Sequence, residues 1–173
     1  NYVCYGQQLG IEVYLASEFT DEDCRFSSTA IRTALGEGNV REAANLLSYN
    51  YSIQGTVVHG DGLAATFGFP TANIQVDDPD KLIPKAGVYV ANAYLQTEKY
   101  PAMLYLGARP TIEQSDEFRI EAHLLGYSGN CYNQPIRVEL IDRLRDEIRF
   151  DDFSQLQSQL LQDREETCRH LML

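Results

Sequence analysis

The 173-residue sequence is poor in the side chains that usually bind transition metals. It has three histidines and four widely spaced cysteines: Cys4, Cys24, Cys131 and Cys168. None forms a C-x-x-C or Cys/His pair at zinc-ligand spacing, so no dedicated transition-metal site is expected. Thiols spaced in this way indicate reduced cysteines, which predicts a cytoplasmic protein.

The sequence also lacks long apolar runs and an excess of positive charge. No stretch approaches the roughly 20 apolar residues of a membrane span, so no membrane partner is expected. Lys and Arg number 14 against 25 Asp and Glu, which gives a net charge of −11. Such a surface repels a phosphate backbone, so nucleic-acid binding is not expected either. A nucleotide can still be bound locally, through backbone N–H groups and a divalent ion.

Hydrophobic periodicity divides the chain at about residues 49–51. Before this point the spacing is helical, because hydroxyl groups at 27–29 suit an N-cap and apolar residues follow one helical face at Ala30, Ile31, Ala34 and Leu35. Residues 36–39 break this pattern, and a second short helix is predicted over 40–47. Residues 11–15 are predicted to form a single strand.

After residue 51 the hydrophobic period changes to two. In the segment 118–125, for example, Ile120 and Ala122 point one way while Arg119 and Glu121 point the other. Six strands are predicted, separated mostly by Gly, Pro, Asp and Asn: 52–59, 72–76, 87–95, 102–106, 118–125 and 136–144. Consecutive strands without intervening helices favour an antiparallel sandwich or barrel, and a barrel leaves no exposed edge.

The chain closes with a predicted amphipathic helix over 153–171. Its apolar stripe consists of Phe153, Leu156, Leu160 and Leu171. We expect this helix to plug or flank the barrel.

Glycines and oxygen-bearing side chains gather in the segment 55–73. Gly60 and Gly62 would let the backbone approach a phosphate and aim its N–H groups at the oxygens. Thr71 and Asn73 offer neutral oxygens that suit Mg²⁺, and residues two apart in an extended segment reach the same ion. On these residues alone a structural role is favoured, in which the glycines shape a hairpin and Thr71 and Asn73 cap a turn.

Two further candidate sites follow along the chain. Glu121, on the polar face of its strand, would serve as a general base in phosphoryl transfer, although a strand carboxylate is usually just solvated. The segment 143–150 carries three arginines near Phe150. An arginine beside an aromatic ring would hold a planar ligand, whereas mixed charges of this kind usually mark a solvated turn.

In combination these segments resemble the riboflavin kinase domain of bacterial bifunctional FAD synthetase. The resemblance covers about 51–171 and rests on the ordered segments GTVVHG, GFPTAN, LIPKAGVYV, LGARPT, IEAHLL, IRVEL and LRDEIRF. Upstream, FSSTAIRTALGEGNVREAANLL is similar to the end of the FMN adenylyltransferase domain of these enzymes. The resemblance implies a six-stranded antiparallel Greek-key barrel at 49–173. It also implies that 1–48 is a short helical remnant of an α/β nucleotidyltransferase domain.

The resemblance also implies an activity and a role for each candidate. The barrel would transfer the γ-phosphate of ATP to the ribityl 5′-hydroxyl of riboflavin, giving FMN and ADP, with Mg²⁺ as the metal. Glu121 would be the base. The ATP phosphates would be bound by Gly60, Gly62, Thr71 and Asn73, and Thr71 and Asn73 would also bind the metal. The flavin would be bound by Arg109, Arg145 and Phe150. A flap at 109–117 would cover the flavin. Ser28, Thr29 and Arg32 would bind ATP in the adenylyltransferase.

Some positions depart from the family pattern. Ala64 and Ala65 stand where the family usually has Gly and a basic residue, and Tyr105 stands where Asn is common. The alternative to a kinase is therefore a degenerate barrel that holds flavin without using ATP, or a purely structural domain. In the full-length parent the barrel would pack on the rest of the adenylyltransferase domain. No HxGH-type motif occurs in this sequence, so FAD formation by this piece alone is not expected.

Overall fold

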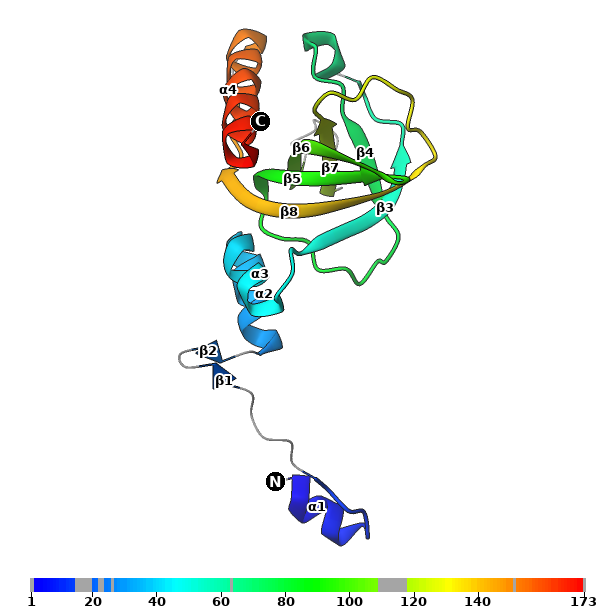
Figure 1. Cartoon of the computed structure of the whole chain (residues 1–173), viewed down its shortest axis with the longest axis vertical. Coiled ribbons are helices and arrows are strands. Elements are labelled where there is room, and N and C mark those ends of the chain that lie inside the picture. Colours follow the sequence, from blue (N-terminus) through cyan, green and yellow to red (C-terminus); the bar gives the residue numbers. More distant parts are fainter. Residues whose placement is uncertain are drawn as a thin grey trace.

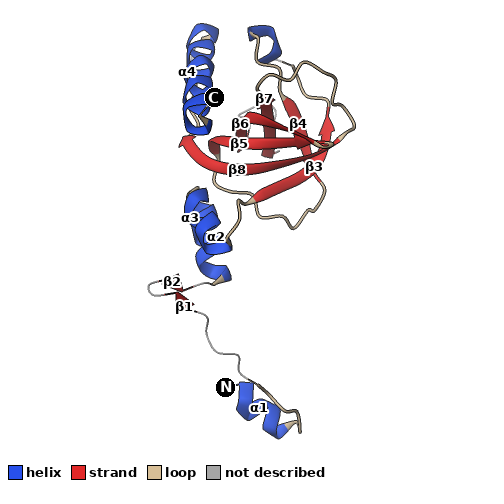
Figure 2. Ribbon diagram, in the orientation of Figure 1, coloured by secondary structure: helices blue, strands red, loops and turns tan. Residues whose placement is uncertain are grey.

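A computed structural model describes residues 2–14, 20–21, 24–25, 27–62, 64–108, 118–150 and 152–172. Figures 1 and 2 show a β-barrel in the second part of the chain, with helices beside it and preceding it. The elements before the barrel are α1 (Tyr2–Gln8), β1 (Thr20–Asp21), β2 (Cys24–Arg25), α2 (Ser28–Glu37) and α3 (Val40–Leu47). The barrel and its attachments are β3 (Ser52–Val58), the 3₁₀ turn η1 (Ala64–Phe67), β4 (Ala72–Val76), β5 (Gly87–Leu95), β6 (Glu98–Ala108), β7 (Phe118–Leu124), β8 (Pro135–Arg145) and α4 (Phe153–Leu171).

The barrel strands are antiparallel throughout, and within the described residues they close in the order β3-β4-β7-β6-β5-β8. Strands β5, β6 and β7 form a meander, and β8 returns to lie beside β5, which is the Greek-key arrangement. The ring closes where β3 pairs with β8, with Ser52 opposite Glu139. The expected six-stranded Greek-key barrel is confirmed.

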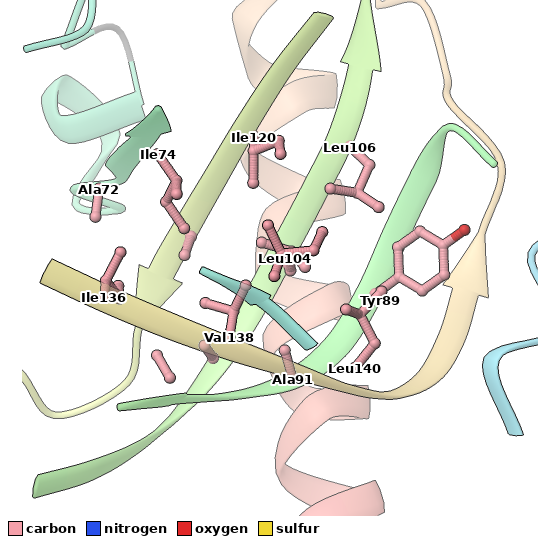
Figure 3. Packing of buried hydrophobic residues seen from close by; sticks show 14 of the residues in the cluster. Ala72, Ile74, Tyr89, Ala91, Leu104, Leu106, Ile120, Ile136, Val138 and Leu140 are labelled. Carbon is pink, nitrogen blue, oxygen red and sulfur yellow. The ribbon is translucent and has the colours of Figure 1, made fainter. Parts of the chain in front are cut away.

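Alternate residues of every strand fill the inside of the barrel. Ile53, Leu104 and Leu140 are fully buried, as is the ring of Tyr89. Figure 3 shows side chains from different strands meeting at the centre of the barrel. Each such side chain contributes roughly 1.5–3 kcal/mol. Because the interior is filled, polar chemistry is left to the outward-facing residues and to the loops.

The helices α2 and α3 pack against the barrel. Ala34, Leu35, Val40 and Ala43 belong to the same buried cluster as the strand residues. Helix α2 begins after Ser27, whose Oγ accepts a hydrogen bond from the N–H of Ala30 at 3.1 Å. Both predicted helices are confirmed, with bounds within two residues of the sequence pattern.

The predicted strand at 11–15 is wrong over its described part. Residues 11–14 have no regular structure, and Leu15 lies outside the described residues. Ile11 and Tyr14 are 59% and 82% exposed, so they lie against no sheet. An alternating pattern forms a strand only when another strand supplies hydrogen-bond partners. Helix α1 was not predicted.

Strand β6 is longer than its pattern indicated. It begins at Glu98 instead of 102 and includes Pro101, a residue that usually ends a strand. At Pro101 the strand is paired with Asn92 of β5, whereas its pairing with β7 starts one residue later, at Ala102. Proline is tolerated here because the bond on this side of the strand is made by its carbonyl oxygen, which accepts from the N–H of Leu125 at 2.8 Å.

Helix α4 has the predicted bounds and flanks the barrel, in contact with β5 and β6. Its buried residues are Asp163 and Thr167, and Phe153 is 60% exposed. The predicted stripe was therefore wrong at its N-terminal end. Figure 1 shows the reason, because the first turns of α4 extend past the strands. There the ring of Phe153 stacks on that of Phe67, with centroids 5.4 Å apart.

Candidate active site

A single row of cross-strand partners crosses the outside of the barrel. Asn73 of β4 lies opposite Glu121 of β7, Glu121 opposite Tyr105 of β6, Tyr105 opposite Val88 of β5, and Val88 opposite Arg145 of β8. Directly paired residues share a face of the sheet. With strands about 4.8 Å apart, Arg145 lies about 14 Å from Glu121 along the barrel surface. We call these five residues the cross-strand row.

The face of the row is settled by the neighbours of its members. Leu104 and Leu106, on either side of Tyr105, are fully buried in the barrel, and Ile120 and Ala122 flank Glu121 in the same way. Because successive strand residues point to opposite faces, Tyr105 and Glu121 point outward. The alternation in the sequence predicted this orientation for Glu121.

A turn before β4 brings Thr71 to the carboxylate of Glu121. The Thr71 hydroxyl donates a hydrogen bond to Oε2 of Glu121 at 3.0 Å, across 50 positions of sequence. Asn73 is the register partner of the same glutamate. The structure thus brings together the proposed metal ligands and the proposed base, which the sequence could place only on separate strands.

Gly60 follows β3 and lies against Asn73. A Cβ atom at Gly60 would stand 2.0 Å from Nδ2 of Asn73, so any larger residue at this position would displace the amide. Gly62 has φ +68°, a left-handed conformation that glycine adopts without strain. Asp61 lies between them and forms an ion pair with Arg119 of β7 at 2.8 Å. The loop after β3 is therefore held to the start of β7.

An open cavity of about 830 Å³ adjoins the row at Asn73. It lies between β4 and β7, whose pairing covers Ala72 and Asn73 and goes no further in the part of the chain that the structure describes. Beyond this point the two strands diverge, and Ile74 and Ile120 line the gap together with Arg119. The volume is within the range of small-molecule sites.

The other end of the row is fixed by helix α4. Arg145 donates from Nε to Oδ1 of Asp163 at 2.9 Å and from an Nη atom to Oδ2 at 2.6 Å. Its second Nη atom donates to the carbonyl of Asp146 at 3.0 Å. Asp163 is 1% exposed and also accepts from Gln159. Paired charges with these additional hydrogen bonds are the form in which an ion pair is stable inside a protein.

Sequence reasoning missed the contact between Arg145 and Asp163. Asp163 is one of several charged residues in 163–166, and an acidic residue on a helix is usually solvated. Its position on the same helical face as Leu156 and Leu160 was the available signal.

Comparison with known proteins shows which family the chain belongs to. Residues 47–171 match the family model for riboflavin kinase. The chain belongs to the riboflavin kinase family. A relative from Listeria monocytogenes is 36% identical over 156 residues, which cover 90% of this chain and 49% of that protein. A relative from Haemophilus influenzae is 40% identical over 142 residues, which cover 82% of this chain and 45% of that protein. Both are named bifunctional riboflavin kinase/FMN adenylyltransferase.

The chain spans about half the length of the curated relatives it matches. Among solved structures, a Streptococcus pneumoniae protein described as a macrolide-efflux protein superposes with a TM-score of 0.81 at 36% identity. The superposition covers 94% of this chain and 53% of that one. In the described part of this riboflavin kinase family member, no helix has both the length and the apolar character needed to cross a bilayer.

The remaining family-implied residues are not members of the cross-strand row. Helix α2 carries three of them on its exposed surface: Ser28, Thr29 and Arg32. Figure 1 shows α2 below the barrel, whereas η1, which lies between Gly60 and Thr71 in the sequence, is above it. Phe150 is half-buried in the segment after β8. Arg109 and the expected flap at 109–117 lie outside the described residues.

The hydroxyl of Tyr105, at one of the positions that depart from the expected pattern, has a defined partner. It donates a hydrogen bond to Oε1 of Glu147. Burial raises the pKa of Tyr105 well above its ordinary value, and the nearby carboxylates of Glu147 and Glu121 raise it further. The phenol is therefore a protonated donor at neutral pH. Sequence reasoning noted the substitution but could not predict the contact, because Glu147 follows it by 42 residues.

A second group of contacts joins α4 to the turn that carries Thr71. Nδ1 of His123 lies 2.8 Å from the carbonyl oxygen of Pro70, and its ring lies 5.2 Å from that of Phe69. The guanidinium of Arg164, from α4, lies over the ring of Phe69 at 5.7 Å from its centroid. Burial lowers the pKa of His123, and Arg164 adds to this effect. His123 is thus a structural neighbour of the turn.

Proposed function

We propose that this chain is an ATP-dependent riboflavin kinase, which transfers the γ-phosphoryl group of ATP to the ribityl 5′-hydroxyl of riboflavin and releases FMN and ADP. The observation that carries the proposal is the cross-strand row. It presents a carboxylate, Glu121, held by Thr71 beside Asn73, and an arginine about 14 Å away. This separation suits a substrate with its reacting alcohol at one end and a planar ring at the other.

In the proposed reaction Glu121 is the general base. The alcohol oxygen forms a bond to the γ-phosphorus while the bond from that phosphorus to the bridging oxygen of ADP breaks. The alcohol proton passes to Glu121, whose other hydrogen bond, from Thr71, fixes the direction of the carboxylate. A positioned base contributes typically 10²–10⁴-fold, and the remainder comes from positioning and electrostatic stabilisation.

The phosphates and their metal would lie at the Asn73 end of the row. Thr71 and Asn73 offer neutral oxygens, a donor set that suits a hard divalent ion already carrying phosphate ligands. We expect Mg²⁺, which would neutralise charge on the transferred group. The lack of a side chain at Gly60 leaves room for the Asn73 amide, and backbone N–H groups of the loop through Gly62 would approach the phosphates.

The flavin ring would lie at the Arg145 end, beside Phe150 and Arg109. The hydrogen-bonding edges of the Arg145 guanidinium are committed to Asp163 and Asp146. The contact that it offers to a planar ring is therefore its flat face, which stacks well on aromatic systems.

We further propose that residues 1–48 are the C-terminal end of an FMN adenylyltransferase domain, in which Ser28, Thr29 and Arg32 bind ATP. The names of the relatives and the half-length match support this division. In the full-length parent, the barrel would pack on the rest of that domain. A cytoplasmic location agrees with Cys131 and Cys168, which are free thiols in the structure.

The test is FMN formation by the purified chain from riboflavin, ATP and Mg²⁺, followed by separation of the flavins. We expect Glu121→Gln to lower the rate about 10²–10⁴-fold while riboflavin binding, measured by fluorescence quenching, persists. Glu98→Gln, which changes an exposed glutamate of β6, is the matched control and should leave the rate unchanged. Full activity of Glu121→Gln would remove the base from the mechanism. Riboflavin bound by the wild type without FMN formation would support the degenerate flavin-binding barrel instead.

A further inference from the structure

The middle of the cross-strand row carries a hydroxyl group that the phosphoryl transfer does not use. Tyr105 is the direct neighbour of Glu121 on one side and of Val88 on the other. Val88, at 6% exposure, has no polar group to offer. A molecule that reaches from Glu121 to Arg145 along the row therefore passes Tyr105, whose hydroxyl is the polar group that β6 contributes.

Tyr105 is half-buried, and its hydroxyl is paired with a residue at the surface. Its partner Glu147 is exposed in the segment after β8, so the hydrogen bond bridges two separate parts of the chain on the outer face of the barrel. Gly107, two residues along β6, has no side chain, and a Cβ there would stand 2.0 Å from Oε1 of Glu147. The glycine thus makes the room that the Tyr105–Glu147 pair occupies.

We propose that Tyr105 and Glu147 form a subsite for the hydroxyl-bearing chain of the flavin and select flavins that carry a polyol over flavins that do not. The inference rests on the proposed function, since it requires the substrate to lie along the row with its terminal alcohol at Glu121. Tyr105 is in this sense a specificity-determining and positioning residue, and the proton transfer remains with Glu121.

The chemistry of the pair matches a polyol. The phenol donates its proton to Glu147, which leaves the phenol oxygen free to accept a hydrogen bond from a substrate hydroxyl. The second carboxylate oxygen of Glu147 accepts another. A ligand without hydroxyl groups would displace water from the pair without forming hydrogen bonds in its place. Sites of this kind discriminate strongly against such ligands.

Strand β6 provides its own matched control. Tyr100 lies on the same strand, away from the row, and its hydroxyl also donates to a glutamate, Glu98, at 3.1 Å. Tyr105→Phe and Tyr100→Phe therefore remove the same atom from the same kind of pair. A difference between the two variants reports on the position in the row.

The experiment compares binding of riboflavin with that of lumiflavin, which has the same ring system without the ribityl chain, by fluorescence titration of the full chain. We expect Tyr105→Phe to weaken riboflavin binding about tenfold, the effect of one hydrogen bond, and to leave lumiflavin binding unchanged. The KM for riboflavin should rise in parallel while the KM for ATP stays constant. Tyr100→Phe should alter none of these values.

Two results would overturn the inference and leave the kinase intact. One is a Tyr105→Phe protein that prefers riboflavin over lumiflavin as strongly as the wild type does. The other is an equal loss of affinity for both flavins, which would assign the residue to ring packing. If the wild type binds neither flavin, the proposed function fails first, and the inference fails with it.

Discussion

The two ends of the cross-strand row are held in different ways. At the Glu121 end, Thr71 and Gly60 come from a turn and a loop, and one 3.0 Å hydrogen bond joins Thr71 to the carboxylate. At the other end, Arg145 is fixed by two hydrogen bonds to Asp163, a buried residue of α4. The helix end of the row is thus part of the folded core, whereas the loop end is shaped by local backbone geometry. We infer that stability and catalysis can be damaged separately.

The largest expected effect is at the helix end. Asp163→Ala removes the buried carboxylate that pairs with the half-buried guanidinium of Arg145, and it should lower the free energy of unfolding by about 3 kcal/mol, the low end for breaking one side of a buried ion pair. Urea unfolding followed by circular dichroism measures this change. Glu165→Ala, which removes an exposed acid two residues away, is the control and should have little effect. Equal stability of the two variants would mean that the ion pair does not anchor α4.

A second substitution tests the loop end. Gly60→Ala places a methyl group 2.0 Å from Nδ2 of Asn73 and should displace that amide by a fraction of an ångström or more. A displacement of this size near the reacting groups should lower kcat/KM for ATP about 10²-fold. Gly36→Ala on α2, where a Cβ meets nothing within 4 Å, is the matched control. If Gly60→Ala instead lowers stability and spares turnover, the proposed separation of the two ends is wrong.

The smallest expected effect concerns pH. Burial lowers the pKa of His123 below its ordinary value of 6.5, so the unfolded chain takes up a proton at a higher pH than the folded protein. Below about pH 6.5 the unfolded state therefore binds more protons, and the free energy of unfolding should fall as the pH falls. Replacing the imidazole in His123→Gln should flatten this part of the stability profile, measured by urea midpoints across the range. An unchanged slope would assign the acid sensitivity to other groups.

The barrel was largely predictable because its signal is local. Strands β4 and β5 have the predicted bounds, because the residues of each segment and its flanking turns are enough to identify a strand. The strand at 11–15 failed for the complementary reason. Its alternation was present, but a strand also needs a neighbour, and Ile11 is exposed. The start of β6 was predicted four residues too late, after Pro101. Whether a proline ends a strand depends on which side of the strand is paired at that residue, and the sequence does not show this.

The site was predictable residue by residue but not as an arrangement. Thr71, Asn73 and Glu121 were recognised from residue type and family resemblance. Their alignment in one row depends on the register of β4, β7 and β6, which distant turns and pairings decide. The pairing of Arg145 with Asp163 depends likewise on how α4 lies against the barrel, and neither residue indicates it locally.

The pairing of β3 with β8 has a consequence for synthesis of the chain. Ser52 emerges from the ribosome long before its partner Glu139, and the β3 edge that Glu139 will cover stays unpaired in the meantime. Asn73 and Glu121 can meet once β7 is made, but Arg145 joins the row last and Asp163 secures it later still. A nascent chain stopped before β8 therefore exposes strand edges, and one stopped between residues 146 and 162 has all six strands but lacks the partner of Arg145. Such fragments should be substrates for chaperones and proteases and should have no partial activity.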